Sequence, residues 1–387
     1  MPNPLSPLEV LEKLIAFPTV SRDSNLPLID WVYEYLTAQG IQAWRHYDAA
    51  APKAALFAHA GPLQEGALVL SAHTDVVPTD GQAWESDPFI LTRRGDRYFG
   101  RGTCDMKGFG ALAIWAMVEA HRRGVARPLQ LALSYDEEIG CLGAPGMVAA
   151  MQKQLPRGSA VLVGEPSMMQ VVSGHKGCSG YDVRLHGYEV HSALLHKGVN
   201  AIMAGAKLVD WANQVNAANQ AKPPSPLAAV FDPPWTSAHV GTIRGGTAFN
   251  ITARACCLDF AFRTVPDETL DQWEEALMAR VRAIEAEMQA VVAETRIDVV
   301  PRFRMPGLVP EERGAAEAMA RKLTGDNGTH VVSYGTDGGV FQKAGYSAVI
   351  CGPGSIEQAH QPNEFITVAQ FEAGHQFIQQ LLKTLQA

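Results

Sequence analysis

The sequence of 387 residues lacks an apolar run of membrane-spanning length, and its beginning lacks the basic flank and apolar segment of a secretory signal. We therefore expect no membrane partner. None of the six cysteines forms a Cys-x-x-Cys pair, and their spacing resembles no disulfide framework. A reducing, cytoplasmic location fits this cysteine usage best.

Positive charge is also in short supply, because 32 Lys and Arg residues stand against 40 Asp and Glu residues, a net charge of −8. This balance disfavours nucleic acid or an anionic membrane as the main partner. The sequence shows no internal repeat and no low-complexity tract. It does have 47% apolar residues, enough to bury large cores, and a length that favours two domains.

Strand and helix patterns alternate over residues 1–178. We predict strands near 54–58, 67–73, 129–135 and 160–163, and helices near 7–17, 26–37, 107–124 and 144–154. This alternation indicates an α/β catalytic domain with a largely parallel, mixed sheet. Residues 179–303 instead combine two long helical stretches with four alternating strands, which predicts an inserted α+β domain. Residues 304–387 then return to the α/β pattern and complete the first domain.

Acidic and histidine residues gather where predicted strands of the first domain end. They are His73 and Asp75 after the second strand, Glu137 and Glu138 after the third, and Glu165 after the fourth. Open α/β sheets bind their ligands beyond the carboxyl ends of the strands. These side chains are therefore expected to meet at one edge of the sheet.

Asp105 occupies a glycine-rich turn, Gly100-Arg-Gly-Thr-Cys-Asp-Met-Lys-Gly108, that opens a helix. Such a turn is suited to presenting a carboxylate to a metal ion, and His360 adds a late imidazole. Imidazole and carboxylate ligands suit zinc and similar divalent ions. A lone histidine is more often a core or surface residue, and a lone Asp after a strand is more often a turn former. The whole set in this order favours a metal site.

Two of these residues are expected to support the ligands rather than join them. Asp75 can orient the imidazole of His73 and fix its tautomer. The neighbours Glu137 and Glu138 cannot both point the same way along an extended chain. We therefore expect one to bind metal and the other to handle protons.

These residues resemble the zinc aminoacylase and peptidase superfamily, whose members include deacetylases and desuccinylases of N-acyl amino acids and glutamate-releasing carboxypeptidases. The resemblance extends from His73 to His360. It implies two Zn²⁺ sites that accept Co²⁺ or Mn²⁺, and a metal-dependent amide hydrolysis. The implied ligands are His73 and Glu165 in one site, Glu138 and His360 in the other, and Asp105 bridging both. The resemblance further implies Glu137 as the general base and Asp75 as the partner of His73.

The inserted domain carries further matches. Gly187-Tyr-Glu-Val-His191 and Gly198-Val-Asn-Ala-Ile202 resemble the superfamily's dimerisation signature. This implies a homodimer in which His191 reaches the neighbouring subunit's active site and stabilises the tetrahedral oxyanion. Asn250 and Arg263 match positions that contact the substrate carboxylate. From the residues alone, ordinary structural roles fit these two positions equally well. Asn250 could cap a turn, and Arg263 could form a surface ion pair.

Three stretches indicate the substrate: Trp84 to Thr92, Gly174 to Gly177, and Cys351 to Glu364. They resemble enzymes that convert N2-acetyl-L-ornithine to L-ornithine and acetate in arginine biosynthesis. Asp337 departs from the pattern, which has Glu there more often, and this change could alter substrate contacts. One alternative is a related N-acyl amino acid hydrolase acting on acetylcitrulline, succinyl-diaminopimelate or other acylated amino acids. The other is a metal-free amino-acid-binding protein that kept the fold.

Overall fold

The computed structural model describes residues 3–386, so the outermost positions of the predicted domain ranges, 1–2 and 387, lie outside the described residues. The chain divides into two compact units. The first consists of the described residues up to Gly174, residues 308–331, and residues from Thr336 onward. The second consists of residues 175–307 and the short segment 332–335. Within residues 3–386, no helix is long and apolar enough to span a bilayer.

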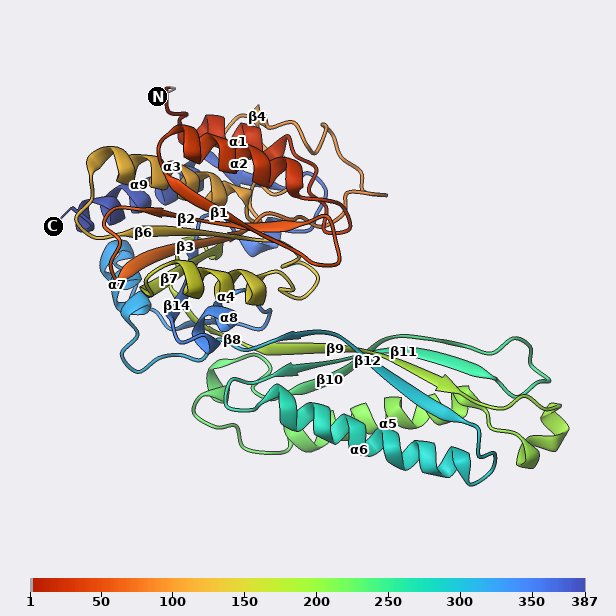
Figure 1. Ribbon diagram of the computed structural model, residues 1–387. Helices are drawn as coiled ribbons and strands as arrows, with labels where there is room; N and C mark the ends of the chain where they lie inside the picture. Colours follow the sequence, from red (N-terminus) through yellow and green to blue (C-terminus); the bar gives the residue numbers. More distant parts are fainter. Residues whose placement is uncertain (1–2, 387) are drawn as a thin grey trace. The chain divides into compact units, whose positions relative to one another are not determined.

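The first unit is built on an eight-stranded mixed sheet (Figure 1). Its strands, in spatial order, are β1 (Gln42–Tyr47), β2 (Ala54–Ala60), β6 (Leu129–Ser134), β3 (Ala67–His73), β7 (Gly158–Pro166), β14 (Ser347–Gly352), β8 (Val172–His175) and β13 (His330–Val332). The neighbours β6, β3, β7 and β14 run parallel, whereas β1–β2, β2–β6 and β14–β8 are antiparallel pairs. Strands β2, β3 and β6 are buried throughout, which explains their nearly continuous apolar sequences. The predicted fold class is confirmed.

Helices cover both faces of this sheet (Figure 1). One face is covered by α1 (Pro7–Ile15), α2 (Leu26–Ala38), α3 (Lys107–Arg123), α7 (Ala315–Thr324) and α9 (Val368–Thr384), which share one hydrophobic core. The other face carries α4 (Ala144–Gln154) and the short α8 (Gly338–Lys343). A capping box opens α1, since Ser6 and Glu9 exchange hydrogen bonds.

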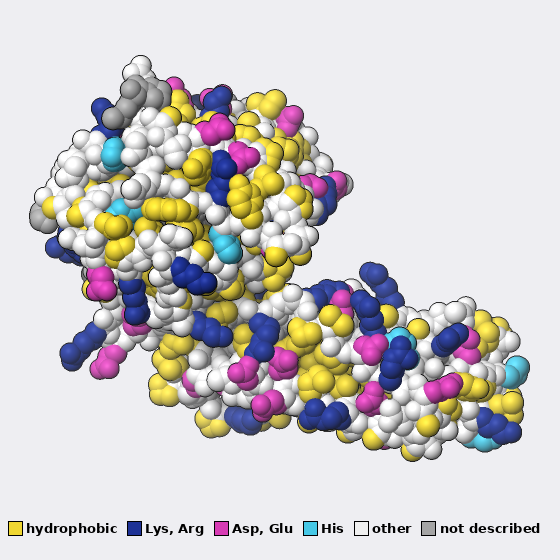
Figure 2. Space-filling view, viewed as in Figure 1, with side chains coloured by type: hydrophobic (Ala, Val, Ile, Leu, Met, Phe, Trp, Pro, Cys, Tyr) yellow, Lys and Arg dark blue, Asp and Glu magenta, His cyan; other side chains and the backbone are white. Residues whose placement is uncertain are grey.

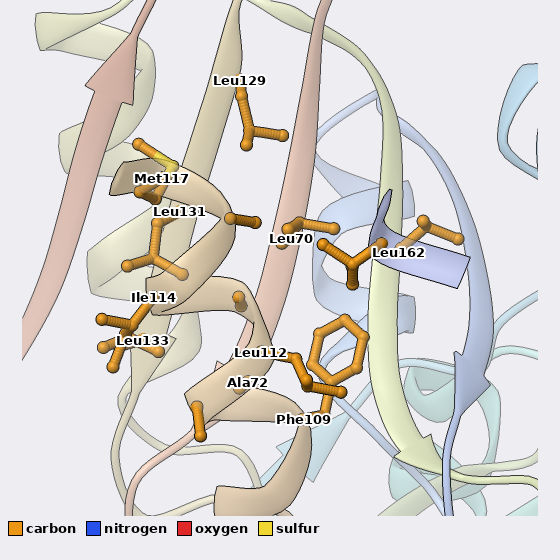
Figure 3. Packing of buried hydrophobic residues seen from close by; sticks show 14 of the residues in the cluster. Leu70, Ala72, Phe109, Leu112, Ile114, Met117, Leu129, Leu131, Leu133 and Leu162 are labelled. Carbon is orange, nitrogen blue, oxygen red and sulfur yellow. The ribbon is translucent and has the colours of Figure 1, made fainter. Parts of the chain in front are cut away.

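Helix α3 lies at the centre of the core and directly follows Asp105. Its side chains Phe109, Leu112 and Ile114 pack on leucines of β3, β6 and β7 (Figure 3). The approach is so close that a Cβ on Gly164 would overlap the ring of Phe109, so β7 needs glycine there. Burying one such phenylalanine contributes about 1.5–3 kcal/mol. This packing fixes the start of α3 against the end of β7, where Glu165 follows Gly164.

A small three-stranded antiparallel sheet joins two distant parts of the first unit. It consists of β4 (Thr92–Arg94), β5 (Arg97–Phe99) and β15 (Phe365–Thr367). Strand β5 ends just before the turn that carries Asp105, and β15 begins shortly after His360. The short helix η3 (Ile356–Gln358) precedes His360. The pairing of β5 with β15 therefore ties together the two loops that carry these predicted ligands.

The second unit is a four-stranded antiparallel sheet with two helices on one face (Figure 1). The strands, in spatial order, are β10 (Ser237–Gly245), β11 (Ala255–Thr264), β9 (Gly177–His186) and β12 (Arg296–Met305). The helices are α5 (Ala201–Gln220) and α6 (Leu270–Gln289), and the short helices are η1 (Ser192–Lys197) and η2 (Ala228–Val230). This is the predicted architecture of two helices and four strands.

The two faces of this sheet differ in chemistry. Leu185, Leu258 and Phe260 pack toward the helices. The other face carries ion pairs, among them those of Arg302 with Asp182 and with Asp259. In the view of Figure 2, which includes α5 and α6 as well as the sheet, the surface of this unit mixes Lys and Arg, Asp and Glu, and hydrophobic side chains. Alternation of polar and apolar residues along each strand produces this division.

Candidate metal centre

Three neighbouring strands bring the predicted ligands to one edge of the first unit's sheet. His73 is the last residue of β3, and Glu165 lies near the end of β7. Glu137 and Glu138 follow β6 after Tyr135 and Asp136. Strands β6, β3 and β7 are adjacent and parallel, so their carboxyl ends meet at the same edge.

Asp105 stands between two histidines. Its Oδ1 lies 3.0 Å from Nε2 of His73, and its Oδ2 lies 3.4 Å from Nε2 of His360. The carboxylate is buried, whereas the side chain of His360 is 55% exposed. Each oxygen of Asp105 therefore faces a different imidazole, which is the arrangement that a bridging carboxylate requires.

Two further carboxylates complete the group, one beside each histidine. Oε1 of Glu165 lies 3.8 Å from Nε2 of His73, and Oε2 of Glu138 lies 2.9 Å from Nε2 of His360. His73, Asp105 and Glu138 each offer one atom that could ligate a metal, and these three atoms lie within 4.8 Å of one another. The structure thus brings all five predicted ligands together.

Glu137 also faces this group. Its carboxylate, that of Glu165 and the imidazole of His73 offer donor atoms that lie within 4.8 Å of one another. The geometry therefore admits Glu137 both as a ligand and as a proton carrier. Its role as the general base stays a prediction.

Asp75 supports the site mainly by accepting hydrogen bonds from the backbone N–H groups of Glu137 and Glu138. Its Oδ1 accepts the N–H of Glu137 at 3.2 Å, and its Oδ2 accepts the N–H of Glu138 at 3.3 Å and the hydroxyl of Ser21 at 2.7 Å. Nδ1 of His73 lies 2.9 Å from the backbone carbonyl of Asp75 and 3.6 Å from Oδ1. Nδ1–H therefore donates to the carbonyl, so that Nε2, once it has lost its own proton, would be the nitrogen that binds a metal ion.

Burial and mutual repulsion raise the pKa values of three glutamates. Burial, followed by the charge of Asp105, raises the pKa of Glu165 well above its usual value and that of Glu138 to about 7. Burial, followed by the charge of Glu165, raises the pKa of Glu137 well above its usual value. A positive charge at the centre would stabilise all three carboxylates in their ionised form.

The imidazoles have the opposite effect on Asp105. Although burial opposes ionisation, hydrogen bonds from His360 and His73 lower the pKa of Asp105. Oε1 of Glu165 is buried and has no hydrogen-bond partner among the described residues. An unsatisfied carboxylate oxygen beside imidazole nitrogens suits a divalent cation, so the donor set fits two such ions.

His191, Asn250 and Arg263 of the second unit were predicted to act in catalysis or substrate binding. The structure brings the segments of His191 and Asn250 together. His191 and Ile251 form an isolated β-bridge, and Ser192 donates its N–H to the carbonyl of Asn250 at 2.9 Å. Arg263 lies on β11 and donates to the carbonyl of Ser333 at 3.3 Å rather than to a carboxylate of the described residues. The catalytic and substrate-binding roles of these residues stay predictions.

Two supporting residues escaped prediction from the sequence. Ser21 binds Asp75 from 54 residues away, and Glu364 binds the turn of Asp105 from about 260 residues away. Ser21 lies in a stretch with no distinctive pattern. Glu364 ends the stretch Cys351 to Glu364, which indicated only the substrate, and it lies four residues after His360.

Comparison with known proteins shows that this chain is related to hydrolases. Residues 69–384 match the family model of peptidase family M20/M25/M40. The acetylornithine deacetylase of Myxococcus xanthus is 33% identical over 366 residues, 92% of each chain. That of Pasteurella multocida is 30% identical over 382 residues, 97% of each chain.

Solved structures show the same fold. An M20 family metallo-carboxypeptidase from Sulfolobus solfataricus gives a TM-score of 0.79 at 17% identity, covering 98% of this chain and 99% of that one. A dinuclear metal-binding M20 peptidase from Bacillus subtilis gives a TM-score of 0.64 at 13% identity, covering 98% and 97%. At such identities these likenesses concern the fold alone.

Proposed function

Because the chain belongs to peptidase family M20/M25/M40 and is a metallohydrolase, we propose that it removes the acetyl group from N2-acetyl-L-ornithine. The products would be L-ornithine and acetate, a step of arginine biosynthesis in the cytoplasm. The main support for metal-dependent hydrolysis is the geometry of Asp105, whose two oxygens each face a different histidine. The choice of substrate is supported by the names of relatives that are 30–33% identical over almost the whole chain.

Two divalent ions fit the site. His73 and Glu165 would hold one, Glu138 and His360 the other, and Asp105 both. When bound, such ions polarise a carbonyl oxygen and activate a water molecule near neutral pH. We propose Zn²⁺, and Co²⁺ or Mn²⁺ would be accepted because the same imidazole and carboxylate ligands suit them.

Glu137 is the proposed proton carrier. Its carboxylate would take a proton from the attacking water and return it to the leaving amine nitrogen, which balances the hydrolysis. Burial raises the pKa of Glu137, and the charge of bound cations would oppose that rise and keep the carboxylate ionised as a base. Asp75 would hold Glu137 in place through the backbone N–H that it accepts. His191 would stabilise the oxyanion, and Asn250 and Arg263 would bind the α-carboxylate of the substrate.

A homodimer is the proposed assembly, and an exposed apolar surface of the second unit supports it. Phe249 is 99% exposed, and Leu195, Met203 and Ile243 are exposed as well. Ile202, at the start of α5, lies against the end of the edge strand β10, so these parts adjoin. Exposed apolar surface beside an edge strand is typical of a protein interface, and a second copy of this chain would cover it.

The function is tested by amine release from N2-acetyl-L-ornithine, measured beside N-acetylcitrulline, N-acetylmethionine and succinyl-diaminopimelate, with and without a chelator. Turnover that is fastest on N2-acetyl-L-ornithine, lost with chelator and restored by Zn²⁺ would support the proposal. If turnover is chelator-sensitive but fastest on another substrate, the metal mechanism would stand and the assignment to arginine biosynthesis would be wrong. Turnover that survives complete removal of metal would refute the metal mechanism.

A further inference from the structure

Glu364 is a buried carboxylate that binds the turn of Asp105 through four donors. Its side chain is 1% exposed. Oε1 accepts the N–H groups of Cys104 at 2.8 Å and Asp105 at 3.0 Å. Oε2 accepts the N–H of Gly102 at 3.0 Å and Nη1 of Arg101 at 2.8 Å. Charge-assisted hydrogen bonds of this kind are stronger than neutral ones, so the turn is held at three successive points of its backbone.

Arg101 extends this network to the loop of His360. It is as deeply buried as Glu364, and its Nη1 also donates to the carbonyl of Gln361 at 3.3 Å. Its Nη2 donates to Oε1 of Gln82 at 2.6 Å, and Nε2 of Gln82 donates to the carbonyl of His360 at 3.0 Å. The guanidinium that Glu364 neutralises therefore binds the carbonyl of Gln361 directly and that of His360 through Gln82.

We propose that Glu364 is a positioning residue that sets the distance between Asp105 and His360. This inference rests on the proposed metal site, since it explains how two of that site's ligands keep their spacing. Glu364 touches neither ligand's side chain. It holds the Asp105 turn directly and the His360 loop through Arg101, and ligand positions must be held to within a few tenths of an ångström for tight metal binding.

A carboxylate is required at this position because both of its oxygens act only as acceptors. In a Glu364→Gln variant, one end of the side chain becomes an NH₂ group. That group must face either the N–H pair of Cys104 and Asp105 or the donors of Gly102 and Arg101. One pair of donors is left unsatisfied in either orientation, so the turn should shift or loosen.

The test is a calorimetric titration of the demetallated protein with Co²⁺, performed well below its melting temperature. For Glu364→Gln we expect both Co²⁺ affinities to fall by about 10- to 100-fold, the usual loss when a residue supporting metal ligands is replaced. The matched control is Glu357→Gln, the same substitution at an exposed residue of η3, which should bind Co²⁺ as the unaltered protein does. A purely structural role would lower the melting temperature and leave the Co²⁺ affinities of the folded variant unchanged, and that result would overturn the proposal.

A second variant decides the matter if Glu364→Gln does not fold. Arg101→Lys keeps the positive charge but cannot reach Glu364, Gln82 and Gln361 together. It should weaken the site that includes His360 more than the site that includes His73. Equal Co²⁺ binding by Arg101→Lys and the unaltered protein would overturn the proposal. If the unaltered protein itself binds no Co²⁺, the metal site and the proposed function fail with it.

Discussion

Removal of Lys53 should destabilise the first unit by leaving a buried carboxylate without its cation. Nζ of Lys53 lies 2.5 Å from Oδ1 of Asp136, and the two side chains are only 9% and 10% exposed. The same ammonium also donates to the carbonyl of Ser21, whose hydroxyl donates to Asp75. Lys53→Met keeps the length of the stem but removes the charge and its donors. The backbone of Asp136 occupies the left-handed region at φ 56°, which limits the residues that can replace it.

The magnitude follows from the burial of the pair. Breaking a fully buried ion pair by removing one partner costs about 3–5 kcal/mol. Residual contact with water at this site reduces that figure to about 2–3 kcal/mol. In a unit of this size each kcal/mol lowers the melting temperature by about 2–4 °C, so Lys53→Met should melt about 4–12 °C lower.

Thermal unfolding followed by circular dichroism, with the metal content held constant, measures this shift. The control is the double variant Lys53→Met/Asp136→Asn, which removes both charges and keeps a residue that tolerates the left-handed region. It should be more stable than the sum of the two single changes predicts, by at least about 1 kcal/mol. A Lys53→Met protein that melts within about 1 °C of the unaltered one would refute the reasoning, and so would strictly additive effects.

Three further predictions concern the site and the assembly. Glu137→Gln should retain both metal ions and lose most turnover, because an amide cannot accept the proton; near-normal amine release would exclude Glu137 as the base. Asp75→Asn should weaken metal binding by about 10- to 100-fold, since its NH₂ group would face a backbone N–H that the carboxylate now accepts. Unaltered affinities in a titration would contradict that role. Phe249→Asp should convert dimers to monomers in sedimentation, whereas the matched change Leu63→Asp, at an exposed residue of the first unit, should not; persisting dimers would show that Phe249 lies outside the interface.

The elements that the sequence predicted are those with a strong local pattern. The continuous apolar run 67–73 and the helical periodicity after Asp105 are both visible locally, and the structure contains both elements. Strand β1 escaped prediction because it is a half-exposed edge strand whose residues, Gln-Ala-Trp-Arg-His-Tyr, show no clear alternation. Strands β4, β5 and β15 have three residues each, so they exist only through their partners.

The same distinction applies to the candidate site. His73, Glu138 and Glu165 were recognisable because they follow strands whose carboxyl ends meet at one edge of the sheet. Asp105 and His360 lie instead on loops that the pairing of β5 with β15 brings together. The contacts of Glu364 with the Asp105 turn join residues about 260 positions apart, and they end on backbone N–H groups. A backbone donor has no residue type by which the sequence could reveal it, so such supports become visible only once the chain is folded.

The hydrogen-bond donors around each acidic residue separate supports from ligands. Asp75 accepts two backbone N–H groups and a hydroxyl, and Glu364 accepts three N–H groups and a guanidinium. The protein itself therefore stabilises these two charges. Oε1 of Glu165 has no donor among the described residues, and Oε2 of Glu138 pairs with the imidazole of His360, itself an expected ligand.

Glu137 stands between these two groups. The donor nearest its carboxylate is the thiol of Cys141, whose Sγ lies 3.4 Å from Oε1, and a thiol is a weak donor. In this respect Glu137 resembles Glu138, because Asp75 accepts the backbone N–H of each, and both differ from the supports Asp75 and Glu364. Carboxylate oxygens that the protein leaves nearly unpaired are available to a metal ion or to a proton. The Glu137→Gln variant separates these two roles, because loss of turnover with both metal affinities retained identifies a proton carrier, whereas loss of metal affinity identifies a ligand.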